Sequence, residues 1–193
     1  MRKKVALRPT ILLPVVIAVA SPNTIDAQDP WLKADAEVVR LSPTAFPELP
    51  SRVSRELVRL GCTIPQAKEL ATRHNVIKGD FGRSRQTDWA VLCSRERISS
   101  ILIFWGGSAK SFSEIANISD DVFLQTIDGG GTIGFSRTIA PAGREYILEH
   151  YRAYHGPRPP PLSHQGIDDG FLEKGSTVYY HYRGRWRELQ GAD

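Results

Sequence analysis

The sequence has few of the residue patterns that usually identify an enzyme. It contains two cysteines in 193 residues and no Cys-x-x-Cys pair, which argues against a redox pair or a zinc site built on closely spaced thiols. No His-Glu-x-x-His is present, so the metalloprotease helix is excluded. No unit of about 20 to 50 residues repeats, which argues against a solenoid or a propeller.

Long apolar runs are also missing. The run Ile11–Ala20 covers about ten residues, roughly half the length of a membrane-spanning helix. Basic residues at positions 2–4 precede it, and it ends in a small-x-small pattern. This order predicts a secretory signal peptide at residues 1–20, cleaved after Ala20 or, alternatively, after Ala27. No cysteine follows the run and no twin-arginine pair precedes it, so the general secretory route is favoured over a lipoprotein.

An excess of one charge is missing once residues 1–20 are set aside. That segment holds four of the 25 basic residues and none of the 21 acidic ones, which leaves 21 basic against 21 acidic residues. The net charge of +4 therefore gives no argument for a nucleic-acid partner. The composition, 24% charged and 41% hydrophobic, is typical of a globular domain. We expect a periplasmic or secreted protein with no membrane span after signal cleavage.

Proline is frequent between residues 21 and 50, which forbids a long helix there. We expect a Pro-rich N-terminal segment at 21–50 that serves as a tether, with one short edge strand near Glu37–Leu41. Residues 51–193 are expected to form a single α+β domain, a mostly antiparallel β-sheet with two or three packed helices. One helix is predicted from Ser51, as N-cap, to Gly61, and a second is predicted to begin after Pro141 and end before Gly156.

Short apolar stretches bounded by turn residues predict the strands. They are residues 76–81, 89–93, 100–105, 122–127, 132–139, 177–182 and 186–189. The last five residues of 100–105 are all apolar, which predicts a strand covered on both faces. Residues 162–175 are expected to be a loop with a short helical turn at Ile167–Leu172.

The two cysteines, Cys62 and Cys93, are expected to form a disulfide. Both lie in the part of the chain that we expect to be exported, where a disulfide can form and persist. The bond would close a loop of 32 residues counted inclusively. The chain-entropy estimate for such a loop is about 3.5 to 4 kcal/mol of stability.

Gly129, Gly131 and Gly134 form a literal G-x-G-x-x-G. A dinucleotide-binding loop needs a helix after it, whereas residues 132–139 have the pattern of a strand. The glycines are therefore interpreted as a hairpin turn beginning at Asp128. No cofactor is expected.

Two resemblances concern the centre of the chain. Asp80-Phe81, a polar loop and Asp88 resemble one hairpin of FG-GAP or VCBS-type repeats, whose acidic loops bind calcium. Here Arg83 and Arg85 stand in the loop where ligands would be, so calcium binding is not expected. More broadly, the chain resembles an uncharacterised family of exported bacterial proteins of unknown function. That similarity is carried by residues 62–66, 75–81, 88–94 and 164–169, and it implies export and one domain but no activity.

The sharpest group of titratable residues is His164 with Asp168 and Asp169. If this segment turns helically, His164 and Asp168 share a face and could bind a metal or act as a base with its orienting acid. A small metal-dependent or His/Asp hydrolase centred on residues 164–169 is therefore the alternative function. The competing interpretation is that one aspartate caps a short helix and His164 bonds to the backbone, which leaves no metal site.

The final hairpin, predicted to turn at Arg183-Gly184, gathers aromatic and basic residues. Strand alternation puts Tyr180 and Tyr182 on one face with Val178, and Tyr179 and His181 on the other. One face, together with the Pro-rich loop that begins at Pro157, is expected to contact a cell-envelope or extracellular protein or a glycan. The residues predicted to bind are Tyr179, His181, Arg183, Arg185 and Trp186. The alternative is that the tyrosines border the core and the arginines solvate its rim. A non-enzymatic exported binding domain is thus the function that the sequence favours.

Overall fold

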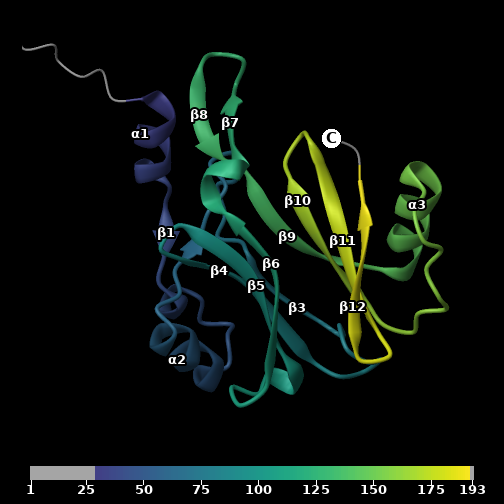
Figure 1. Ribbon diagram of the computed structural model, residues 1–193. Coiled ribbons are helices and arrows are strands. Elements are labelled where there is room, and N and C mark those ends of the chain that lie inside the picture. Colours follow the sequence, from purple (N-terminus) through teal and green to yellow (C-terminus); the bar gives the residue numbers. More distant parts are fainter. Residues whose placement is uncertain (1–28, 192–193) are drawn as a thin grey trace, which may run out of the picture.

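The computed structural model describes residues 29–191. Two four-stranded antiparallel sheets form most of this part of the chain (Figure 1). The predicted signal peptide lies outside the described residues. The first sheet has the order β3-β4-β5-β6 and the second the order β12-β11-β10-β9. Two further pairs, β1-β2 and β7-β8, complete the twelve strands of the described part, and all pairings are antiparallel. With three helices, this is the α+β class that the sequence predicts.

The elements of the described part have the following bounds. The helices are α1 (Pro30–Glu37), α2 (Ser51–Arg59) and α3 (Arg144–Tyr154). The first sheet comprises β3 (Val76–Gly79), β4 (Asp88–Arg95), β5 (Ile98–Phe104) and β6 (Phe112–Ser119). The second comprises β9 (Arg137–Ala142), β10 (Gly166–Phe171), β11 (Gly175–Tyr182) and β12 (Arg185–Gln190). The small pairs are β1 (Arg40–Leu41) with β2 (Ile64–Pro65), and β7 (Leu124–Ile127) with β8 (Thr132–Phe135).

The two large sheets form a sandwich with a helix on each outer side. The outer face of the first sheet packs Val91 and Leu102 against Leu57 of α2. The inner faces meet in a core that includes Leu92, Ile101 and Ile103 of the first sheet with Ile167 of the second. The outer face of the second sheet packs Val178 and Leu189 against Ile147 of α3. As predicted, β5 is buried on both faces, since Ile101, Leu102, Ile103 and Phe104 are all fully buried.

The sheets approach each other at one side, where β3 lies against β9. The fully enclosed Asn75 joins them, because its amide nitrogen donates to the carbonyl oxygens of Pro65 (2.7 Å) and Arg137 (3.1 Å). Its amide oxygen accepts from the backbone nitrogen of Ile139 (3.0 Å). The outermost strands, β6 and β12, lie at the opposite ends of their sheets and have one strand neighbour each among the described residues. The sandwich is therefore closed at β3 and β9 and ends in two unpaired edges, at β6 and at β12.

Several local predictions are confirmed. Cys62 and Cys93 form a disulfide that links the end of α2 to β4. The helix that begins at Ser51 is α2, with Pro50 rather than Ser51 at the N-cap, and Gly61 follows it with φ of +73°. Gly129 and Gly131 lie in the turn between β7 and β8, as predicted, and Gly134 lies in β8. Apart from these predictions, the structure contains no helix within residues 29–191 that is long and apolar enough to cross a membrane.

Other local predictions are wrong. Residues 30–37 lie in the segment expected to be a tether, but they form helix α1. Pro30 occupies the first turn, where a missing N–H costs nothing, and Asp29 caps the helix. The predicted strand 132–139 is two strands of different sheets, separated at Ser136. The segment 167–172 contains no helical turn, since Gly166–Phe171 is the strand β10 between β9 and β11. The strand β6 was not predicted at all.

Candidate ligand groove

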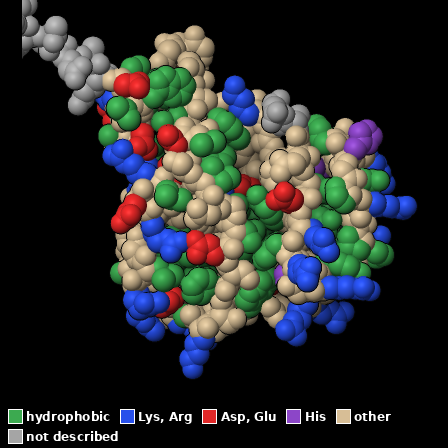
Figure 2. Space-filling view, in the orientation of Figure 1, with side chains coloured by type: hydrophobic (Ala, Val, Ile, Leu, Met, Phe, Trp, Pro, Cys, Tyr) green, Lys and Arg blue, Asp and Glu red, His purple; other side chains and the backbone are tan. Residues whose placement is uncertain are grey.

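A groove of about 880 Å³ lies between the unpaired edges of β6 and β12, within the size range of ligand sites, about 300 to 1,000 Å³. We call it the tyrosine groove. Its walls are residues 115–118 of β6, Pro157, Arg158 and Pro160 of the loop after α3, Tyr179, Tyr180 and Tyr182 of β11, and residues 186–188 of β12. In Figure 2, hydrophobic side chains occupy the middle of this face of the molecule, and Lys and Arg side chains gather toward the lower right.

The lining shows that the groove lies beyond the edge of the second sheet rather than on one of its faces. Tyr179 and Tyr180 are adjacent in β11, so their side chains point to opposite faces of the sheet, yet both line the groove. The same holds for the neighbours Arg187 and Glu188 in β12. A ligand in the groove would therefore contact both faces of the hairpin and run past the outer edge of β12.

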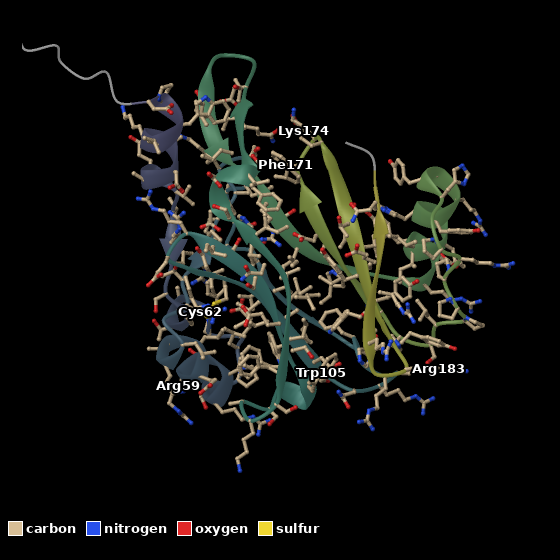
Figure 3. The ribbon with its side chains drawn as sticks, in the orientation of Figure 1. Arg59, Cys62, Trp105, Phe171, Lys174 and Arg183 are labelled. Carbon is tan, nitrogen blue, oxygen red and sulfur yellow. A yellow bond between two sulfur atoms is a disulfide. The ribbon has the colours of Figure 1, made fainter. Side chains whose placement is uncertain are left out.

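An aromatic cluster supports β12 where it borders the groove. The ring of Trp186 stacks on Trp105, with centroids 5.8 Å apart and an angle of 23° between the planes. His181 packs against both rings, at 5.3 Å from Trp105 and 5.5 Å from Trp186. Figure 3 shows Trp105 at the lower end of the first sheet, on the side nearer the hairpin turn that carries Arg183. The cluster fixes the edge of β12 to the first sheet.

Burial lowers the pKa of His181, and the nearby positive charge of His164 lowers it further, while Asp88 opposes the shift. The neutral imidazole is thus favoured against the two indole rings. Burial also raises the pKa of Tyr179 to about 12, with the negative charges of Asp169 and Glu188 adding to the effect. Tyr179 therefore stays a neutral phenol at physiological pH, available as a hydrogen-bonding and stacking surface.

The charged side chains of the groove are mainly basic. Arg158 and Arg187 line it, and neither makes an ion pair with any residue in the range 29–191. Arg183, in the turn, places its guanidinium 5.3 Å from the ring centroid of Tyr182. Glu188 is the acidic residue of the lining. Exposed guanidinium groups beside tyrosine rings suit a ligand that carries negative charge.

The structure separates the five residues predicted to bind. Tyr179 and Trp186 line the groove, and His181 lies with them on the inner face of the second sheet. Arg183 occupies the turn, and Arg185 pairs with Tyr182 on the opposite face. Residues 115–118 were missed as lining residues, and Arg158 was not named, although the Pro-rich loop that holds it was expected to take part in binding. The first set belongs to the strand that was not predicted, and Arg158 comes near β12 only through the path of the loop after α3.

The cluster of His164, Asp168 and Asp169 is not assembled. The prediction depended on a helical turn, whereas in β10 the adjacent Asp168 and Asp169 point to opposite faces of the sheet. His164 lies before the strand, with its Nδ1 atom 3.0 Å from the backbone oxygen of Gln165. No three His, Cys, Asp or Glu side chains in the described part of the chain are grouped to hold a metal ion. The hydrolase hypothesis therefore gains no geometric support.

Asp169 faces the interior, where Arg137 binds it with two hydrogen bonds of 2.8 Å from Nε and Nη2. The remaining Arg137 donors reach the carbonyl and hydroxyl oxygens of Ser99 (3.0 and 2.8 Å) and the carbonyl oxygen of Ala116 (2.9 Å). The ring of Phe123 covers the guanidinium at 4.4 Å. All five N–H groups of Arg137 are thus used, and Asp169 has a structural partner.

Asp168 faces α3. Burial raises its pKa, although hydrogen bonds with Ser176 and Tyr146 and the positive charge of His150 act in the opposite direction. Its Oδ1 atom and the Nε2 atom of His150 are buried and have no hydrogen-bond partner within the described residues. The carboxylate is therefore held in a partly satisfied site under the helix, away from His164.

A second hollow, of about 380 Å³, lies between α1, the segment 66–73 and β8. Aliphatic side chains such as Val38 and Leu70 dominate its lining, which contains no tyrosine or tryptophan. It offers less for specific recognition than the tyrosine groove. Comparisons with protein-family models, curated proteins and solved structures give no match for this chain.

Proposed function

We propose that the protein is an exported, non-enzymatic domain that binds a partner molecule in the tyrosine groove. The observation that carries this proposal is the lining: three tyrosines, a tryptophan and two arginines without ion pairs in residues 29–191 border one cavity of ligand size. Aromatic and arginine side chains are the residue types that contribute most to binding energy at protein surfaces.

Two further observations support the location. The disulfide between Cys62 and Cys93 is typical of proteins that fold outside a reducing cytosol. The signal peptide predicted at residues 1–20 would direct the chain to such a compartment. The proposed class of partner is a cell-envelope or extracellular protein or glycan.

The test is a ligand screen followed by substitution in the groove. The immobilised protein is screened against a glycan array and a random peptide library, and each retained ligand is measured again on Tyr182→Ala. Tyr182 lines the groove at the end of β11, so its loss should weaken a groove ligand by about tenfold or more. Tyr154→Ala is the matched control, because Tyr154 is an exposed tyrosine of α3 that does not line the groove.

The proposal fails if every retained ligand binds the two variants equally. It also fails if no ligand of either class is retained. Thermal melts of both variants show whether a loss of binding comes from unfolding instead of from the missing side chain.

A further inference from the structure

We propose that the ligand of the tyrosine groove is an extended acidic peptide segment, which pairs with the outer edge of β12 as an additional strand. This inference rests on the proposed function and specifies its partner. It is carried by two observations: the outward backbone groups of β12, and the basic side chains on either side of that edge.

The turn between β11 and β12 fixes which backbone groups point outward. Arg183 and Gly184 both have positive φ, +49° and +79°, as in the two-residue turns that connect antiparallel strands. Tyr182 and Arg185 then form the first hydrogen-bonded pair, and the pairs alternate along the ladder. The N–H and C=O groups of Trp186, Glu188 and Gln190 therefore point away from β11, and within residues 29–191 no backbone bond outside the ladder uses them.

The groove encloses this edge from both sides. On the inner face, Trp186 and Tyr179 would contact one set of alternating side chains of an added strand. On the outer face, Tyr182, Arg187 and Arg158 would contact the other set. Backbone pairing with alternating side-chain contacts is the recognition mode of strand addition. A glycan could bond to single backbone groups through its hydroxyls, but only a peptide strand matches the regular spacing of the donors and acceptors along β12.

Charge selects the kind of peptide. Arg158 and Arg187 line the groove, Arg183 and Arg185 extend the basic surface along the hairpin, and all four are exposed. Glu188 is the lining residue of opposite sign. An acidic segment is therefore favoured, and a basic one is disfavoured. A second copy of this chain is a poorer occupant, because its own β12 carries Arg185 and Arg187 against the single acidic residue Glu188 and so has the same sign of charge as the groove.

The edge of β6, on the other wall, is not suited to pairing. Ala116 and Asn117 together oppose Ser100, which makes a β-bulge with Ala116 at φ of +54°. The bulge turns the carbonyl oxygen of Ala116 to the buried guanidinium of Arg137. A straight added strand can therefore continue along β12 but not along β6.

The experiment uses a random library of seven-residue peptides, displayed and selected on the whole protein. Enriched peptides are expected to carry net negative charge, and methylation of their backbone nitrogens one at a time is expected to weaken binding with a period of two. Each methylated nitrogen that faces β12 should cost about three- to tenfold in affinity, since it removes one hydrogen bond. If methylation weakens binding without this alternation along the peptide, or if the enriched peptides are basic, the inference is overturned.

A pair of variants tests the same edge from the protein side. Glu188→Pro removes an outward N–H, which a proline at the edge of a sheet does not need for pairing with β11, and should weaken an enriched peptide by about tenfold. Glu188→Ala removes the same side chain but keeps the N–H, and should bind about twofold more tightly because an acidic group has gone. Equal affinities of the two variants contradict strand addition. If Glu188→Pro does not fold, the methylated peptides decide the question with the unaltered protein.

The outcomes separate this inference from the proposed function. Loss of an enriched peptide on Tyr182→Ala, with no effect of methylation or of Glu188→Pro, keeps the groove as a binding site and rejects strand addition. If the protein retains anionic glycans and no peptide, the groove is likewise kept as a binding site and strand addition is rejected. A dimer of the free protein that Glu188→Pro dissociates, seen by sedimentation, overturns the inference in favour of a second copy as the occupant.

Discussion

The interior between the two sheets and the groove at their open edges both contain arginine and aromatic side chains. The arginine of the interior has all its hydrogen-bond partners within the fold, whereas the arginines of the groove have no ion-pair partner among the described residues. In the interior, Arg137 uses every donor on Asp169, Ser99 and Ala116, under the ring of Phe123. In the groove, Arg158 and Arg187 line the same cavity as three tyrosines and make no ion pair with any described residue. The presence of arginine next to aromatic residues therefore does not by itself indicate a binding site. The two regions differ in whether the fold already supplies partners for the guanidinium group.

The largest effect should come from breaking the interior pair. Arg137→Met leaves Asp169 as a buried charge without a partner, which is expected to lower the free energy of unfolding by about 3 to 5 kcal/mol. Arg187→Met in the groove should change it by less than about 0.5 kcal/mol. Urea unfolding at neutral pH measures both. Similar losses for the two variants would abolish the contrast between the regions.

A double variant sharpens this result. Arg137→Met with Asp169→Leu removes both charges, so the desolvation cost disappears together with the pair, and a large part of the lost stability should return. If the double variant is as unstable as Arg137→Met, the hydrogen bonds to Ser99 and Ala116 matter more than the ion pair.

The disulfide should have the next largest effect, and it should separate stability from binding. Reduction of the bond between Cys62 and Cys93 is expected to lower the free energy of unfolding by about 3.5 kcal/mol, because the unfolded chain regains the freedom of a long loop. The bond lies in the core between α2 and the first sheet, and neither cysteine lines the groove. Affinity for a groove ligand should therefore not change while the protein remains folded. The Cys62→Ala, Cys93→Ala variant, whose melt should not respond to reductant, is the control.

The smallest effect concerns Asp168, on the face of the second sheet under α3. Its pKa is raised in the folded protein, so the folded state favours the protonated carboxyl, and the stability gained from it is lost as pH rises through the folded pKa. Asp168→Asn is neutral at every pH and should melt higher than the native protein at pH 7. The difference should shrink as pH falls below the ordinary aspartate pKa of 3.8. Thermal melts across this range test it, and a lower melting temperature of the variant at pH 7 contradicts it.

Local chemistry made much of the fold predictable. The apolar β5, the turn at Arg183-Gly184 and the pairing of the two cysteines follow from residue type and spacing, and the structure confirms them. The strand β10 was missed because its sequence, Gly-Ile-Asp-Asp-Gly-Phe, has two aspartates that disfavour a strand in isolation. Only Arg137, 32 positions away, makes the buried Asp169 acceptable there.

The candidate site was predictable only in part, for a related reason. The aromatic content of the final hairpin pointed to Tyr179 and Trp186, which do line the groove. Its other walls come from β6 and from the loop after α3, which are distant in sequence. β6 alternates weakly because a bulge shifts its pattern at Ala116, whose carbonyl oxygen accepts a hydrogen bond from Arg137. The strand β10 and the β6 wall of the groove were both missed because they depend on partners that are distant in sequence.

The bulge in β6 has a consequence for the stoichiometry of assembly. A strand added to a sheet normally presents a fresh edge of its own, and repeated addition of this kind is how fibrils grow. In the groove, a strand paired with β12 would turn its far edge toward β6, where Ala116 is out of register and its carbonyl oxygen is already bonded to Arg137. The fold would therefore stop growth after one strand, which favours one-to-one complexes over polymers.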